Sequence, residues 1–172
     1  MKHLIAIIFL TCGFSVSFAQ SDIDKRLAEL GIELQEPSAP VANYVKAVRT
    51  GNLVYLSGHG PLKADGNNIE GKVGKNLTTA EGAEAARVTA IGLLSSLKAE
   101  LGDLSRVKRI VKVNGWVNCT DKFKEQPQVM NGCSDLLVAV FGDKGKHART
   151  SLGTNSLPGN IAVEIEMVVE VE

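Results

Sequence analysis

The sequence is poor in aromatic residues and cysteine, and it has no excess of charge. Phe, Trp and Tyr make up 5% of the 172 residues, and 19 basic side chains balance 19 acidic ones. It has neither a basic block nor a patch of mixed basic and aromatic residues, the features that mark nucleic-acid surfaces. Nucleic acid is therefore not favoured as a partner. Two of the three cysteines, Cys119 and Cys133, could form a disulfide in an oxidising compartment or remain as buried thiols.

Histidine is equally scarce, which argues against metal and triad chemistry. Beyond the N-terminal segment there are only His59 and His147, without the spacing of a metal-binding motif. Ser57 lacks the glycine two positions before it that a nucleophile elbow requires. A near-match to a phosphate-binding loop at 66–72 lacks both the residue that binds magnesium and the helix that should follow. The sequence thus predicts no metal site.

The one long apolar run lies at the N-terminus. A basic start, an apolar stretch over 4–18 and a small-residue site ending at Ala19 are the three parts of a secretory signal peptide. The run is too short for a comfortable membrane span. We expect cleavage after Ala19, which leaves one domain at 20–172 in a periplasmic or secreted protein without membrane contact.

The pattern of apolar residues predicts a leading helix followed by elements in the order β-β-α-β-α-β-β. A capping box at Thr78-x-x-Glu81 opens a long helix, and Gly102 closes it. The predicted elements are a helix at 21–31, a hairpin at 44–49 and 53–57, a helix at 78–102, a strand at 107–119, a helix within 123–141, and strands at 148–157 and 161–172. The glycine-rich stretch 58–76 is predicted to be a loop. Two amphipathic helices and a sheet with one dry face indicate a two-layer α+β domain.

The last strand alternates apolar residues with glutamates, the pattern of a strand with one dry face. Turn residues at 157–160 predict that it pairs with the preceding strand as a hairpin, which would place Arg149 near Glu164 and Glu166. A guanidinium can bind a small carboxylate bidentately, and a glutamate beside it could orient or deprotonate a water. The alternative is an internal ion pair between Arg149 and Glu164 or Glu166.

Several segments resemble the Rid family, the YjgF-like reactive imine deaminases that are also labelled L-PSP endoribonucleases. These segments are 44–48 (YVKAV), 51–59 (GNLVYLSGH), 148–151 (ARTS), 157–158 (LP) and 163–166 (VEIE). The resemblance covers nearly the whole chain after the N-terminal segment. It implies a chorismate-mutase-like fold, with a mixed sheet covered on one face by two helices, and a homotrimer with pockets between subunits.

The same resemblance implies hydrolysis of 2-imino or enamine acids to 2-oxo acids and ammonia, without a cofactor. Arg149 would clamp the substrate carboxylate, and Glu164 would hold the attacking water. The remaining substrate-binding candidates are Tyr44, Ser57, Gly58, His59, Asn131 and Ser151, with Tyr44 and the Ser57–Gly58 backbone coming from the neighbouring subunit.

This chain departs from the family pattern at three places. Ser151 stands where cysteine is common, His59 stands where glutamine is usual, and the helix around Asn131 is longer. These departures indicate a divergent branch. Hydrolysis of a related small carboxylate, a non-catalytic trimer that binds small acids or acts as a chaperone-like surface, and an endoribonuclease therefore stay open. The neutral charge disfavours the last.

Overall fold

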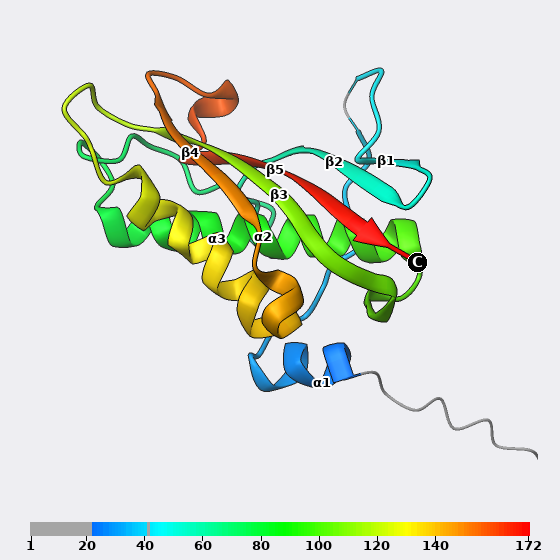
Figure 1. The fold of residues 1–172 in the computed structure, drawn as a ribbon. Coiled ribbons are helices and arrows are strands. Elements are labelled where there is room, and N and C mark those ends of the chain that lie inside the picture. The colour runs from blue at the N-terminus through cyan, green and yellow to red at the C-terminus, as the bar shows by residue number, and fades with distance from the viewer. Residues whose placement is uncertain (1–21, 41) are drawn as a thin grey trace, which may run out of the picture.

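The computed structural model describes residues 22–40 and 42–172, so the predicted signal peptide at 1–19 lies outside the described residues. A five-stranded sheet carries helices on one face (Figure 1). The strands are β1 (Ala47–Thr50), β2 (Leu53–His59), β3 (Val107–Asn118), β4 (Ala148–Thr154) and β5 (Val163–Val171). The helices are α1 (Asp22–Glu29), α2 (Thr79–Leu101) and α3 (Gln126–Phe141). The predicted order of elements and the α+β class are confirmed.

The strand order is β1-β2-β5-β3-β4, and every neighbouring pair is antiparallel except β3 and β4, which are parallel. The predicted first hairpin is confirmed by the pairing of β1 with β2. The predicted C-terminal hairpin is wrong, because β3 lies between β4 and β5. The connection at 155–162 is longer than the loops of about two to five residues that join hairpin strands. It carries the chain past the end of β3 instead.

The core lies between the sheet and the two long helices. The inward side chains of β5 are at most 1% exposed: Val163, Ile165, Met167, Val169 and Val171. On α2, Leu93, Leu94 and Leu97 are completely buried against them. Each such side chain contributes roughly 1.5–3 kcal/mol on leaving water. The alternation along β5 therefore decides which face of the sheet the helices cover.

Both long helices begin and pack as their local sequence dictates. Thr78 caps α2 in a complete capping box with Glu81, as predicted. The helix α3 begins at Gln126, because a proline such as Pro127 is tolerated in a first turn. A side chain at Gly132 would overlap the Ala83 carbonyl of α2, so only glycine allows the two helices to approach this closely. The shorter α1 contacts α3 on the side away from the sheet (Figure 1).

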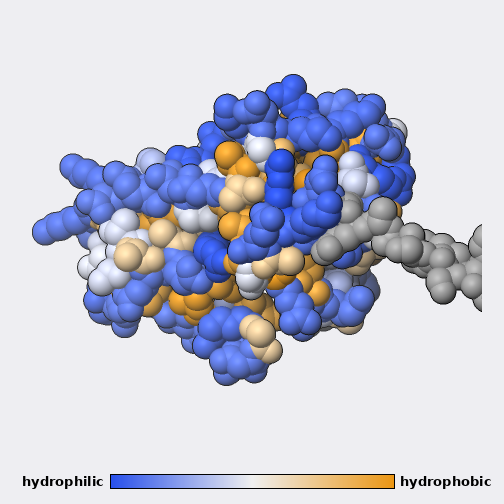
Figure 2. Space-filling view, turned by 90° about the horizontal axis from the view of Figure 1, so that it is seen from below, coloured by the Kyte–Doolittle hydropathy of each residue, from blue (hydrophilic) through white to orange (hydrophobic). Residues whose placement is uncertain are grey.

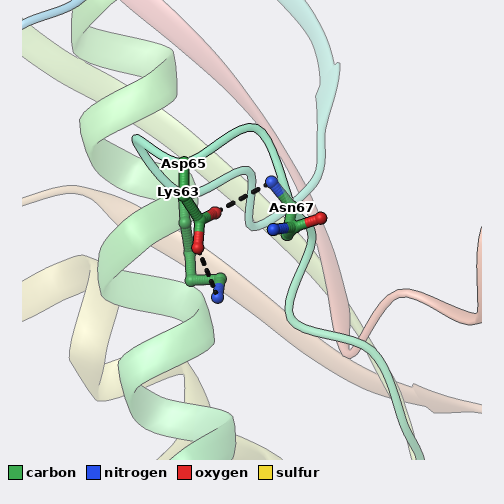
Figure 3. Close-up of polar contacts among 3 residues, drawn as sticks. All are labelled: Lys63, Asp65 and Asn67. Carbon is green, nitrogen blue, oxygen red and sulfur yellow. Dashed lines mark hydrogen bonds and ion pairs between the residues drawn. The ribbon is translucent and has the colours of Figure 1, made fainter.

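A long loop joins β2 to α2 and contains only isolated bridges, as expected, although β2 continues through Gly58 and His59, which the sequence placed in the loop. Its tip is closed locally around Asp65 (Figure 3). One carboxylate oxygen accepts the Asn67 amide at 2.9 Å, and the other lies 3.1 Å from the Lys63 ammonium. A bridge between Glu70 and Ile161 attaches the loop to the segment before β5.

The two sides of the molecule differ in their surface chemistry. The helix side is mostly hydrophilic, with hydrophobic side chains showing in the grooves between polar ones (Figure 2). The open face of the sheet carries large apolar side chains that are about half exposed, namely Val48 (54%), Tyr55 (46%) and Leu152 (52%). Cys119 and Cys133 are both buried and free. None of the described helices combines the length and apolar character that a membrane span requires.

Candidate functional site

Arg149 lies on β4 and is held by α3. Its Nη1 donates hydrogen bonds to Asn131 Oδ1 at 2.9 Å and to Ser134 Oγ at 3.0 Å. Among the described residues no carboxylate forms an ion pair with this guanidinium. The alternative of an internal ion pair with Glu164 or Glu166 is therefore wrong.

The hydrogen bonds of Arg149 leave one edge of its guanidinium available. A guanidinium has five N–H donors, and both hydrogens of Nη1 are used on α3. Within the described chain, Nε and Nη2 have no hydrogen-bond partner. Together they form the planar fork that binds a carboxylate with two parallel hydrogen bonds. Ser151 lies two residues further on the same side of β4, opposite Gly115 of β3.

A histidine lies behind this arginine. His147 contacts the Gly145 carbonyl through Nδ1 at 2.7 Å and the Ser134 hydroxyl through Nε2 at 3.1 Å. Burial lowers the pKa of His147 below its ordinary value of 6.5, and the charge of Arg149 lowers this pKa further. The sequence did not point to Ser134 or His147 as site residues. Ser134 could have been found from Asn131, because residues three apart share one helix face.

Glu164 lies on β5 and points to the open face, away from the helices. Its carboxylate lies directly against Gly58, where any Cβ would overlap Oε1. Burial raises the pKa of Glu164 above its ordinary value, and repulsion from Glu166 raises this pKa further. A carboxyl group of this kind holds a proton more readily than a fully solvated one.

A β-bulge shapes the strand beside Glu164. Leu56 pairs with Met167 and His59 with Ile165, so Ser57 and Gly58 together lie opposite one residue of β5. The Ser57 hydroxyl donates to the Val45 carbonyl at 2.6 Å. This bond ties the bulge to the segment that precedes β1, which carries Tyr44 with 44% of its surface exposed. Tyr44, Ser57, Gly58 and Glu164 thus belong to one neighbourhood, the Glu164 half-site.

His59 does not line that half-site. Its ring is buried on the helix side of β2, where Nδ1 contacts the Ser57 carbonyl and Nε2 contacts the Ser96 hydroxyl of α2, each at 2.7 Å. Burial lowers the pKa of His59, with a smaller contribution from Lys46. The expectation of a substrate contact is corrected accordingly. The bulge returns His59 to the helix side, where it supports the backbone of Ser57.

The Arg149 half-site, formed by Arg149, Asn131, Ser134 and His147, does not meet the Glu164 half-site within one chain. Arg149 is level with Val113 of β3, and Glu164 is level with Trp116. Two strand spacings across and three residues along separate their Cα atoms by roughly 14 Å. Their side chains also lie on opposite faces of the sheet. A neighbourhood shared through a hairpin, as the sequence predicted, is therefore wrong.

The open face also carries a shallow hollow of about 190 Å³ beside Ser57. Its polar wall includes Glu166, which accepts a hydrogen bond from Asn114 at 2.8 Å, and Lys112, which donates to Thr150 at 2.9 Å. In the described parts of the chain, no three His, Cys, Asp or Glu side chains come together as metal ligands.

The fold is a two-layer, chorismate-mutase-like α+β fold. Residues 24–171 match the family described as "YjgF/chorismate_mutase-like, putative endoribonuclease". The chain belongs to this family, and the resemblance drawn from its sequence motifs is confirmed.

Three proteins are similar to this chain in sequence or structure. Protein TCP17 of Trypanosoma cruzi is 43% identical over 88% of this chain and 96% of its own length. The 2-iminobutanoate/2-iminopropanoate deaminase of Dermatophagoides farinae is 28% identical over 77% of this chain and 89% of its own length. Among solved structures, a protein of unknown function from Agrobacterium tumefaciens is 41% identical, with a TM-score of 0.79 over 87% of this chain and 91% of its own.

Proposed function

We propose that this protein hydrolyses small 2-imino acids to 2-oxo acids and ammonia. The observation that carries the proposal is the Arg149 guanidinium. It is fixed on one side by α3, and its Nε–Nη2 edge has no partner among residues 22–40 and 42–172. The deaminase name of the Dermatophagoides farinae relative supports the same reaction class.

The proposal includes a homotrimer in which each site combines two subunits. The half-exposed apolar side chains on the open face need a cover, and a second copy of the chain supplies one. The Arg149 half-site of one subunit would then face the Glu164 half-site of the next. Arg149 and Glu164, which lie apart within one chain, would then meet as residues of two neighbouring subunits.

In this site Arg149 would bind the substrate carboxylate and thereby place the imine carbon. Glu164 would accept a proton from water as its oxygen attacks that carbon, giving a carbinolamine. The glutamic acid would return this proton to nitrogen. Glu164 would then carry the carbinolamine hydroxyl proton to the same nitrogen, so that the C–N bond breaks, the C=O bond forms, ammonia leaves and Glu164 is again ionised. The raised pKa of Glu164 suits both the uptake and the return of a proton. The reaction is a hydrolysis, so its balance needs only water.

The test is imine hydrolysis with 2-iminopropanoate generated in situ, with Glu164→Gln as the variant. We expect acceleration by the wild type and a loss of about 10²- to 10⁴-fold in Glu164→Gln, because the proton acceptor is removed. Glu170→Gln on the same strand is the matched control and should retain activity. A wild-type protein that does not accelerate hydrolysis would overturn the proposal.

A second candidate is a non-catalytic trimer that binds small acids through the same arginine. A 2-oxo acid at 100 times its dissociation constant would stabilise such a protein by about 2.7 kcal/mol and so raise its melting temperature. The protein would not hydrolyse the imine. An endoribonuclease is disfavoured, because each of the two described histidines contacts a serine and a backbone carbonyl. Export after cleavage at Ala19 remains part of the proposal.

A further inference from the structure

A chain of hydrogen bonds runs from the backbone through His147 and Ser134 to Arg149. Gly145 supplies a carbonyl, which can only accept, so Nδ1 of His147 carries the proton. In the neutral ring Nε2 is then an acceptor, and the Ser134 hydroxyl must donate to it. The lone pairs of Ser134 Oγ are thereby left to accept from Nη1 of Arg149. With a neutral His147, the donor and the acceptor of each hydrogen bond in this series are therefore fixed.

We propose that Ser134 and His147 are positioning residues for Arg149, holding its guanidinium so that the Nε–Nη2 edge meets the substrate carboxylate. The inference rests on the proposed function for the identity of the ligand. The orientation itself follows from the hydrogen bonds. Asn131 alone could hold one hydrogen of Nη1 while the guanidinium plane tilted. Ser134 takes the second hydrogen, and two fixed bonds on one nitrogen define the plane.

The neutral form of His147 is the form that this arrangement requires. Its surroundings favour that form, because the ring is half-buried and lies near the positive Arg149. The thiol of Cys133 on α3 supplies no compensating negative charge, since burial raises its pKa to about 12. In the turn before β4, Asp143 is paired with Lys146 at 2.8 Å.

The proposal predicts a specific defect when the Ser134 hydroxyl is removed. Ser134→Ala should free one hydrogen of Nη1 and weaken binding of 2-oxobutanoate about fivefold, the effect of losing one hydrogen bond. The loss should fall on KM, with kcat nearly unchanged. Ser134→Thr keeps a hydroxyl and should recover most of the binding. His147→Phe keeps a ring without hydrogen bonds and should change binding in the same direction.

The experiment measures 2-oxobutanoate binding by calorimetry together with the Arg149 side-chain signals by NMR. In the wild type the Nη signals should be separate and slow to exchange, and in Ser134→Ala they should broaden as rotation about Cζ–Nε accelerates. Ser95→Ala is the matched control, because this buried α2 serine donates only to the Ile91 carbonyl of its own helix. Melting curves establish that each variant is folded.

The outcomes separate this inference from the proposed function. Arg149 signals and KM that are unchanged in a folded Ser134→Ala protein would overturn the positioning role. Equal losses in Ser134→Ala and Ser95→Ala would overturn it as well. An additive loss in the Arg149→Ala, Ser134→Ala double variant would contradict action through the arginine. A wild type that binds no oxo acid and hydrolyses no imine overturns the proposed function, while the NMR readout still decides the positioning role.

Discussion

The two histidines of the described chain form similar bridges with different endpoints. Both contact the carbonyl two residues before them through Nδ1, and both contact a helix serine through Nε2. His59 is buried between β2 and α2, and its bridge with Ser96 holds the backbone of the bulge. His147 is half-buried, and its bridge with Ser134 continues to the Arg149 guanidinium.

The two bridges differ in what they hold: the His59 bridge holds backbone, and the His147 bridge holds a charged side chain. The His59 bridge fixes where Gly58 presents its backbone to Glu164, so breaking this bridge should mainly change stability and the shape of the pocket. The His147 bridge fixes a charged side chain, so breaking it should mainly change how a carboxylate binds. The predictions below test that division, from the largest expected effect to the smallest.

The largest effect is expected at the end of the His147 bridge. If Arg149 binds the substrate carboxylate as proposed, Arg149→Ala removes a charge-assisted, bidentate contact. Such a loss typically costs about 2–5 kcal/mol, so we expect kcat/KM to fall at least roughly thirtyfold. Arg149→Lys should recover little, because an ammonium cannot reproduce the planar fork. Kinetics of imine hydrolysis and thermal melts measure the two effects separately.

Stability should change much less than activity in Arg149→Ala, because the arginine has no carboxylate partner within the described chain. A folded Arg149→Ala protein with wild-type turnover would exclude Arg149 from the site. A large fall in the melting temperature with proportionate loss of activity would assign it a structural role instead.

An intermediate effect on activity is expected at Gly58, which lies in the bulge supported by the His59 bridge. In Gly58→Ala the new Cβ overlaps the Glu164 carboxylate and must displace it, so we expect roughly a tenfold loss of kcat, since a small misplacement in a site is costly. Gly92→Ala is the control, because its Cβ would lie 3.7 Å from the His59 ring, an ordinary contact. Alanine inside α2 should instead stabilise the fold by about 0.5–1 kcal/mol. Equal activity in the two variants would separate Gly58 from the chemistry.

The smallest effect is a loss of stability in acid that both bridges share. The pKa values of His59 and His147 are lowered in the folded state, so near their ordinary value of 6.5 the unfolded chain binds more protons. Stability is therefore complete above about pH 6.5 and declines as the pH falls toward the folded pKa values. His59 should contribute more than His147, because its ring is the more buried.

Melting temperatures between about pH 7 and pH 5 measure this effect, with His59→Asn and His147→Asn compared to wild type. Each variant should show a shallower decline. Glu164 acts in the opposite direction, because its pKa is raised and its ionisation disfavours the fold as the pH rises above about 4.5. The difference between wild type and each variant isolates the histidine. Parallel curves for all three proteins would contradict the assignment of neutral, buried histidines.

Most of the fold was predictable because each element carries its own local signals. The capping box at Thr78, the glycine at Gly102 and the alternation along β5 are local, and the structure confirms all three. The partner of β4 was not predictable in this way. Turn residues at 157–160 indicate a reversal of the chain but do not say which strand lies beside the next one. The predicted strands at 148–157 and 161–172 left only a short turn between them, whereas in the structure β4 ends at Thr154 and β5 begins at Val163, so the connection is longer than a hairpin loop.

The candidate site was predictable only in part, because its residues come together through tertiary contacts. Arg149 and Glu164 were found from motifs, yet their placement on opposite faces follows from the β3–β4 pairing. His147 was missed because nothing local marks a single histidine before a strand. Ser134 was missed although its spacing of three residues from Asn131 places both on one face of the helix. His59 was misassigned because the bulge at Ser57 and Gly58 shifts the alternation of β2 by one residue.

The measurement that tests the account most directly mixes two inactive variants. Arg149→Ala and Glu164→Gln chains, co-expressed in equal amounts, should assemble at random. If each site takes its arginine from one subunit and its glutamate from the next, about one quarter of the sites receive both groups, so about one quarter of wild-type activity should return. Each variant alone should remain inactive. A folded, fully mixed assembly with no recovered activity would contradict a site shared between subunits.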